Sequence, residues 1–199
     1  MSTHPRRDGW NDRHRGREAG GEPEPFVKEM LPRLVHTGLA IDVAAGRGRH
    51  SMVLADHGLR VVAIDYSQEA IAALAKLVER PRGAIWPALA DLATFPIKSE
   101  SADLIVNVNY LDRQLFPKFT RALKPGGMLL ADTFLIDQAA LGHPRNPRFM
   151  LDHYELLALL EGFQILCYRE GLTVYPDQTR AWRASALATR KDRNGCRHA

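Results

Sequence analysis

The sequence has few cysteines and no long apolar run. Its 199 residues include only Cys167 and Cys196, which are too few for a disulfide scaffold and lack the spacing of metal ligands. We therefore expect no metal site and a reducing, cytoplasmic location. No stretch reaches the roughly 20 apolar residues that a membrane helix needs. The N-terminus is polar and rich in arginine, without an apolar segment, so we expect no secretory leader.

The sequence also lacks the pattern of a nucleic-acid-binding surface. The net charge is +4, but much of the excess lies in the last ten residues, which hold Arg190, Lys191, Arg193 and Arg197. A basic end of this kind is usually a solvated tail. No segment alternates aromatic and basic side chains, as a base-stacking surface does. We therefore expect a small-molecule partner rather than nucleic acid.

Composition divides the chain into three parts. Residues 1–25 are rich in Arg, Gly, Glu and Pro, which predicts an extended or mobile N-terminal arm. Residues 26–190 alternate short apolar runs with amphipathic stretches and are expected to form one domain. Residues 191–199 form the basic tail. The overall content of 45% hydrophobic and 25% charged residues is ordinary for a globular protein.

Hydrophobic periodicity predicts strands that alternate with helices. The expected strands are 39–43, 61–64, 84–87, 104–108, 128–134, 163–168 and 181–189. One helix follows the first strand and ends near Gly58, and Ser67 is expected to cap the next. Another is expected to bury Leu115, Phe116, Phe119, Ala122 and Leu123, and to end at 124–127. A last helix should open with a capping box from Asp152 to Glu155 and close at Gly162.

This alternation predicts an α/β fold, doubly wound, with a mostly parallel seven-stranded sheet covered by helices on both faces. The last two strands are expected to form an antiparallel hairpin. Sheets of this type bind ligands at the carboxyl ends of their strands. The loops after the first four strands should therefore carry the functional residues.

The first of these loops contains small residues at Ala44, Gly46 and Gly48, which allow a sharp turn and close approach of a ligand to the backbone. A dinucleotide-binding turn would need a third glycine, which is absent. Asp65 follows the second strand, where a carboxylate can accept hydrogen bonds from both hydroxyls of a ribose. A purely structural turn and a helix-capping aspartate are the alternative interpretations of these residues.

Asp91 follows the expected third strand. A carboxylate at this place can accept a hydrogen bond from an exocyclic amine such as that of adenine, with Leu92 packed on the ring. The alternative is an aspartate that serves only the local turn.

Taken together, these residues resemble the class I S-adenosylmethionine (SAM)-dependent methyltransferases. The glycine turn, Asp65, Asp91, the segment 102–107 and the segment 124–130 match the order of the motifs of that family. In the family's pattern the residue at position 44 is a glycine, and Ala44 is expected to tighten the turn or to shift the methionine end of the ligand. The resemblance implies SAM as cofactor. The residues that it places at the cofactor are Asp42, Ala44, Gly46, Gly48, His50, Asp65, Tyr66, Asp91, Leu92 and Asn107.

A narrower resemblance is to small bacterial methyltransferases of the tellurite-resistance type. It rests on the segments 10–14, 25–26, 42–50 and 109–113. In that group the N-terminal arm folds over the cofactor, so residues 10–14 are expected to act as a lid. His14 stands where the group has a tyrosine.

The acceptor side is less well defined by the sequence. The candidate catalytic residues are His14, Tyr110 and Arg183, the last as a possible anion-binding side chain. Arg180 and Arg183 should lie on opposite faces of one strand. Asn107 to Tyr110 has the spacing of the Asn-Pro-Pro-Tyr motif of nitrogen methyltransferases but lacks both prolines.

The expected reaction is in-line transfer of a methyl group from SAM to a small nucleophile, such as a thiol or a chalcogen oxyanion. His50, His143 and His153 are candidate bases but are more typical of surface or capping histidines. Two alternatives remain open at this point: a non-catalytic SAM-binding sensor or partner module, and a nicotinamide-dependent oxidoreductase. The sequence does not define the oligomeric state.

Overall fold

The computed structural model describes residues 9, 11, 12, 14, 15, 20–78 and 85–191. Trp10, Arg13, Cys196 and the basic tail beyond Lys191 lie outside the described residues. The chain forms two compact units, Met1–Pro96 and Ile97–Ala199. Among the described residues, no helix is long and apolar enough to cross a membrane.

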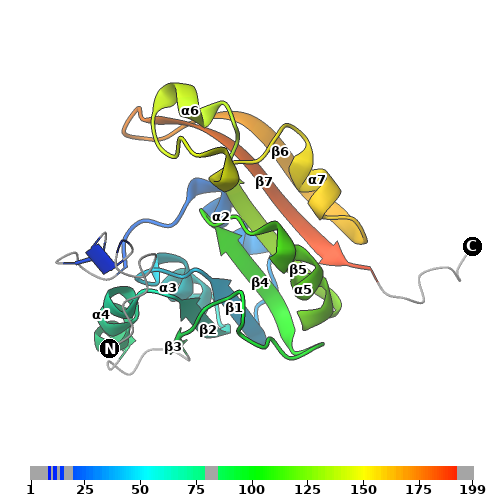
Figure 1. Cartoon of the computed structure of the whole chain (residues 1–199). Coiled ribbons are helices and arrows are strands. Elements are labelled where there is room, and N and C mark those ends of the chain that lie inside the picture. Colours follow the sequence, from blue (N-terminus) through cyan, green and yellow to red (C-terminus); the bar gives the residue numbers. More distant parts are fainter. Residues whose placement is uncertain (1–8, 10, 13, 16–19, 79–84, 192–199) are drawn as a thin grey trace, which may run out of the picture. The chain divides into compact units, whose positions relative to one another are not determined.

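The unit Met1–Pro96 contains three parallel strands. Its elements are α2 (Pro25–Met30), η1 (Leu31–Arg33), β1 (Leu39–Val43), α3 (Arg49–Asp56), β2 (Arg60–Asp65), α4 (Gln68–Val78) and β3 (Ile85–Leu89). Val43 pairs with Ile64, and Asp65 pairs with Leu89, so the three strands end at the same edge. The loops that follow them therefore lie close together (Figure 1).

Helix α4 shows how the sequence produces an element of this unit. Ser67 Oγ accepts a hydrogen bond from the backbone N–H of Ala70 at 3.2 Å, which confirms the predicted cap. Ala70 and Leu74, one turn apart, are fully buried. The helix is thus stabilised by its cap and by its apolar face together.

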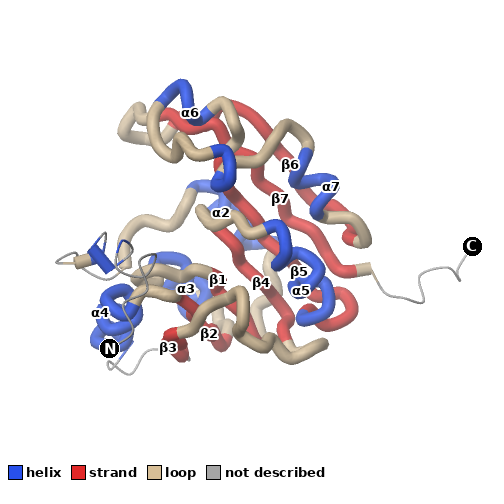
Figure 2. Tube along the Cα trace, viewed as in Figure 1, coloured by secondary structure: helices blue, strands red, loops and turns tan. Residues whose placement is uncertain are grey.

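The described residues of the unit Ile97–Ala199 form the other four strands, which Figure 2 draws in red. Its elements are β4 (Ala102–Val108), η2 (Arg113–Leu115), α5 (Phe116–Ala122), β5 (Leu123–Phe134), α6 (Gln138–Leu141), η3 (Pro147–Phe149), α7 (Glu155–Leu159), β6 (Phe163–Val174) and β7 (Arg180–Arg190). β4 and β5 are parallel, whereas β7 is antiparallel to both β5 and β6.

The strand order is β3-β2-β1-β4-β5-β7-β6. This order confirms the predicted doubly wound α/β class with seven strands, and β6 and β7 form the expected antiparallel hairpin. Strand interiors such as Ile64, Val106 and Leu130 are fully buried, as near-continuous apolar runs in such sheets require.

One predicted boundary is wrong. The segment 124–127 was expected to end a helix before a strand at Met128, but β5 already begins at Leu123. Leu123 pairs with Ala102 and Met128 pairs with Leu104, so the intervening residues form a bulge within the ladder. Lys124 Nζ meets the carboxylate of Asp103 at 2.8 Å and holds this irregular start.

The last helix also differs from the prediction. α7 begins only at Glu155, and its N-cap residue is Tyr154 with a left-handed φ of 62°. Glu155 does accept the backbone N–H of Asp152 at 2.9 Å, as in a capping box. The N-cap residue Tyr154 makes no side-chain cap, so the helix does not begin from Asp152 as the predicted motif requires.

Candidate functional site

The turn after β1 has three residues in left-handed backbone conformations: Ala44 (φ 52°), Gly46 (φ 56°) and Gly48 (φ 81°). The N–H of Ala45 donates to the carbonyl of Ile64 at 2.9 Å and ties the turn to the end of β2. Ala44 adopts this conformation although alanine disfavours it by about 1–2 kcal/mol. The predicted sharp turn therefore forms without the glycine that the family pattern has at this position.

Gly46 and Gly48 serve different purposes. A Cβ at Gly48 would lie 2.4 Å from Leu74 Cδ1, a buried side chain of α4, whereas a Cβ at Gly46 would lie 3.5 Å from His14 Cε1 of the arm. From sequence, both glycines are expected to allow a ligand to approach the backbone, which stays a prediction. The packing adds that a side chain at Gly48 would clash with α4.

Asp65 organises the edge where β1 and β2 end. Its Oδ2 accepts the backbone N–H of Gly46 and its Oδ1 accepts that of Ser67, each at 2.7 Å. Its exposed fraction is 8%. A carboxylate has about four lone-pair positions, so these two bonds leave acceptor capacity for two further donors.

Asp42 lies one residue before the end of β1 and is 1% exposed. Ser51 Oγ, from α3, donates to its Oδ2 at 2.5 Å. Burial raises the pKa of Asp42 to about 7; the Ser51 hydrogen bond lowers that pKa, and the nearby Asp65 raises it. Asp42 therefore links the end of β1 to α3 through its hydrogen bond with Ser51 and stabilises the turn between them. The sequence did not indicate this contact.

The residues after β2 and β3 have contrasting environments. Asp91 is exposed, and its Oδ1 accepts the N–H of Ala93 at 2.9 Å, which is the contact expected of a turn aspartate. Leu92 is 4% exposed and packs in the protein interior. Tyr66 is half-buried. Contact of these residues with adenine stays a prediction.

The described residues of the arm lie against the turn and against α4. Asn11 Oδ1 accepts a hydrogen bond from Ser67 Oγ at 2.9 Å, and Gly20 N–H donates to the carbonyl of Arg47 at 2.9 Å. His14 is half-buried beside Gly46. These contacts bring the arm to the same edge as Asp65, where the lid hypothesis requires it.

His50 is 4% exposed, so the expectation of a surface histidine is wrong. Its Nε2 accepts the backbone N–H of Glu24 at 3.3 Å, just before α2. Arg49 strengthens this junction, because its Nη2 pairs with Glu24 Oε1 at 2.8 Å. His143 and His153 are exposed, as expected.

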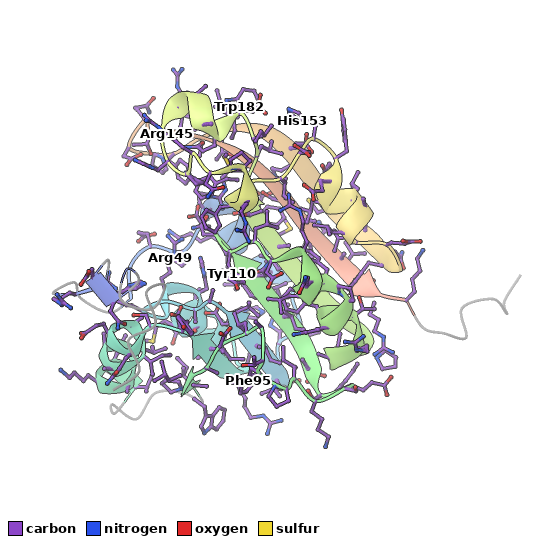
Figure 3. All side chains as sticks on the ribbon, viewed as in Figure 1. Arg49, Phe95, Tyr110, Arg145, His153 and Trp182 are labelled. Carbon is purple, nitrogen blue, oxygen red and sulfur yellow. The ribbon has the colours of Figure 1, made fainter. Side chains whose placement is uncertain are left out.

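The remaining candidates, Asn107 for the cofactor and Tyr110 and Arg183 for the acceptor, belong to the unit Ile97–Ala199. Asn107, near the end of β4, is 2% exposed, and its Oδ1 has no hydrogen-bond partner among the described residues. Tyr110 follows β4 and is half-buried (Figure 3). Asn109, between them, has a left-handed φ of 58°, a conformation that asparagine tolerates.

Arg183 does not have the surroundings of an anion-binding side chain. It is 2% exposed, and its Nε and Nη2 meet Asp132 Oδ1 and Oδ2, both at 3.0 Å. Arg180 is exposed, so the two arginines do lie on opposite faces. The anion-binding interpretation is corrected because a carboxylate of β5 already occupies the guanidinium fork.

No group of three His, Cys, Asp or Glu side chains within the described ranges could hold a metal ion. Sequence reasoning missed two supporting residues, Ser51 and Asp132, and it expected Asn11 as part of the lid segment without its contact to Ser67. Their roles depend on partners distant in sequence, so no local pattern indicates them.

Comparisons with known proteins match this geometry. The family profile described as "Methyltransferase domain" matches residues 40–127, which include β1 to β4 and the glycine turn. No curated protein matches the sequence. The profile match favours a methyltransferase over the nicotinamide-dependent alternative.

Solved structures match most of the chain. A SAM-dependent methyltransferase from Methanosarcina mazei has 19% identity and a TM-score of 0.68, over 86% of this chain and 99% of that chain. TehB from Haemophilus influenzae has 21% identity and a TM-score of 0.71, over 85% and 63%. A structure concerned with conversion of a disulfide bond into a thioacetal group in echinomycin biosynthesis has 18% identity and a TM-score of 0.75, over 96% and 94%.

Identities this low show a shared fold, while the profile match identifies the domain. Residues 40–127 therefore match a methyltransferase domain, and the chain has the fold of SAM-dependent methyltransferases.

Proposed function

We propose that SAM binds at the edge where β1, β2 and β3 end, and that its methyl group passes to a small-molecule acceptor. The observation that carries this proposal is Asp65. Its two carboxylate oxygens hold the N–H groups of Gly46 and Ser67 and keep lone pairs for the two hydroxyls of a ribose. Gly46, which packs less tightly than Gly48, is the position of the turn where a ligand would approach the backbone.

The surrounding residues fit the other parts of the cofactor. Asp91 is an exposed carboxylate in the loop after β3, suited to accept a hydrogen bond from an adenine amine. His14 of the arm lies beside Gly46 and is placed to cover the ligand's amino-acid end. Asp42 supports the turn from beneath through Ser51.

When bound, SAM supplies an electrophilic methyl group on a sulfonium. The task of the chain is to hold the acceptor in near-attack geometry and to keep water out, which can account for several kcal/mol of the barrier. A general base is needed only when the nucleophile arrives protonated. A thiolate or an oxyanion of a heavier chalcogen arrives deprotonated.

We propose such a soft nucleophile as the acceptor. The sequence resemblance to the tellurite-resistance type supports a chalcogen oxyanion. The structural neighbour from echinomycin biosynthesis acts where a disulfide becomes a thioacetal, which supports a sulfur acceptor. The low cysteine content supports a cytoplasmic location.

The test is transfer of label from methyl-labelled SAM to a panel of thiols, selenite, tellurite and small amines. We expect a labelled thioether or a methylated chalcogen, and no labelled amine. The Asp65→Ala variant serves as control and should transfer much less at limiting SAM. Failure of every acceptor in the panel would contradict the proposed acceptor class, and labelled amines would replace it.

A further inference from the structure

A buried ionic network lies at the carboxyl ends of β4 and β5. The guanidinium of Arg183 forms a two-point contact with the carboxylate of Asp132, and both side chains are 3% exposed. Ser185 Oγ donates to Asp132 Oδ1 at 2.9 Å. The Cζ of Arg183 also lies 4.5 Å from the ring centroid of Phe134. Packing and hydrogen bonds therefore fix this guanidinium on several sides.

The network extends to the turn that follows β4. Arg183 Nη1 donates to Asn109 Oδ1 at 2.7 Å. The backbone N–H of Asn109 donates to the carbonyl of Asp132 at 2.8 Å, and Arg183 Nη2 donates to that same carbonyl at 3.3 Å. Arg183 of β7 thus holds the side chain of Asn109, and Asp132 of β5 holds its backbone.

Stability alone is a weak explanation for this arrangement. A buried ion pair is often no more stabilising than apolar side chains of similar volume, because both charges lose their hydration. The contact to Asn109 has a more specific consequence. It fixes Asn109, which has a left-handed backbone and directly precedes Tyr110. The contact therefore determines the direction of the chain at Tyr110.

We propose that Arg183 is a positioning residue for methyl transfer: through Asn109 it fixes the turn that presents Tyr110 to the acceptor. This inference rests on the proposed function. Arg183 itself does not touch the acceptor, because its fork is occupied by Asp132 and its surface is buried. Tyr110 is half-buried in the segment that follows β4 (Figure 3), and the proposal assigns it to the wall of the acceptor site.

The test compares variants that remove the Arg183–Asn109 hydrogen bond with variants that change only the stability of the fold. Asn109→Gly keeps the left-handed backbone accessible and removes the acceptor of the Arg183 hydrogen bond. Asn109→Asp keeps an acceptor oxygen for Arg183 Nη1 and should retain the ordered turn, although the added charge in a buried network should lower the melting temperature. Arg183→Lys keeps a positive charge beside Asp132 but lacks the planar fork. Ser185→Ala is the matched control, because it removes a hydrogen bond to Asp132 without touching Asn109.

Two measurements are made on the full chain: amide hydrogen exchange over residues 109–114, and kcat and KM for the acceptor found in the panel, with SAM affinity from calorimetry. Loss of a hydrogen bond to a charged group should lower kcat/KM for the acceptor about tenfold in Asn109→Gly and Arg183→Lys. Both should speed exchange in the turn and leave SAM affinity unchanged. Ser185→Ala should lower only the melting temperature.

The proposal is overturned if exchange in the turn is unchanged in Asn109→Gly, or if Ser185→Ala loses kcat/KM as much as Asn109→Gly does. The exchange measurement needs no acceptor. A panel without any methylated product would contradict the proposed acceptor class, and hydrogen exchange would still decide whether Arg183 fixes the turn.

Discussion

Gly46 and Gly48 share a left-handed backbone but differ in what surrounds them, and this difference can be measured. Gly48→Ala would place a Cβ 2.4 Å from Leu74 Cδ1, so overpacking and backbone strain together should cost about 2–4 kcal/mol of stability. Gly46→Ala meets only ordinary contact with His14 and should cost about 1 kcal/mol. Denaturant unfolding without ligand measures both. Equal losses would contradict the packing described for Gly48.

Asp42 should make stability depend on pH. Its pKa is raised from 3.8 to about 7 in the folded chain, so between these values the folded state holds a proton that the unfolded state has released. Stability therefore falls as pH rises through this window and levels off above about 7, by an amount on the order of a few kcal/mol.

Asp42→Asn tests this effect, because asparagine can still accept the hydrogen bond from Ser51 but carries no charge. The stability of the variant relative to the natural protein should increase from pH 5 to pH 8. Denaturant unfolding at the two pH values provides the comparison. A difference that is constant with pH would show that the buried carboxyl is not the titrating group.

Individual residues were predictable from sequence only where the cause is local. Asp65 was identified from its place after a strand, and Ser67 from its place before a helix. The role of Gly48 depends on Leu74, and that of Arg183 on Asp132, which are distant in sequence. The alternation of side chains along a strand indicated that one of Arg180 and Arg183 points inward. It did not indicate that the carboxylate of Asp132 pairs with that arginine.

The N-terminal arm is the element whose contribution is best tested by removal. Asn11 accepts hydrogen bonds from Ser67 Oγ and, at 3.5 Å, from the N–H of Glu69, at the start of α4. Removal of residues 1–20 should leave the domain folded, because the strands and their helices lie after residue 20. SAM affinity and turnover should fall together, as expected when a lid is lost.

Asn11→Ala is the milder form of this change, since it removes only the contact of the arm with α4. Calorimetry should rank SAM affinity as natural protein, then Asn11→Ala, then the truncated chain. A truncated chain that binds SAM and turns over like the full chain would show that the arm is only a tail.

Elements were predicted well where hydrophobic periodicity is strong. The predicted ends of β1, β2 and β4 lie within two residues of the observed ends. Buried parallel strands are short apolar runs in the sequence, which makes them easy to identify. The start of β5 was missed because Lys-Pro-Gly-Gly is typical of a turn, and here these residues form a bulge inside the strand ladder. The start of α7 was missed because Tyr154 caps it from a left-handed conformation that the sequence does not indicate.

At the scale of the whole molecule, the candidate residues divide between the two compact units. The glycine turn, Asp65, Asp91 and the arm belong to Met1–Pro96, whereas Asn107, Tyr110 and the Arg183 network belong to Ile97–Ala199. We therefore expect variants of Asp65 and Gly46 to change SAM affinity and variants of Asn109 and Arg183 to change use of the acceptor. The fold class was predictable as a whole, because strand–helix alternation determines it without any single contact.

The most direct test of the account is calorimetric titration of SAM into the natural protein and into Asp65→Ala, with NADP as a second ligand. Charge-assisted hydrogen bonds contribute roughly 1.5–3 kcal/mol each, so Asp65→Ala should weaken SAM binding about tenfold or more. The natural protein should bind SAM and its demethylated product but not NADP, because the Asp65 carboxylate repels a 2′-phosphate. Unchanged SAM affinity in a folded Asp65→Ala variant, or tight binding of NADP, would contradict the assignment of this site.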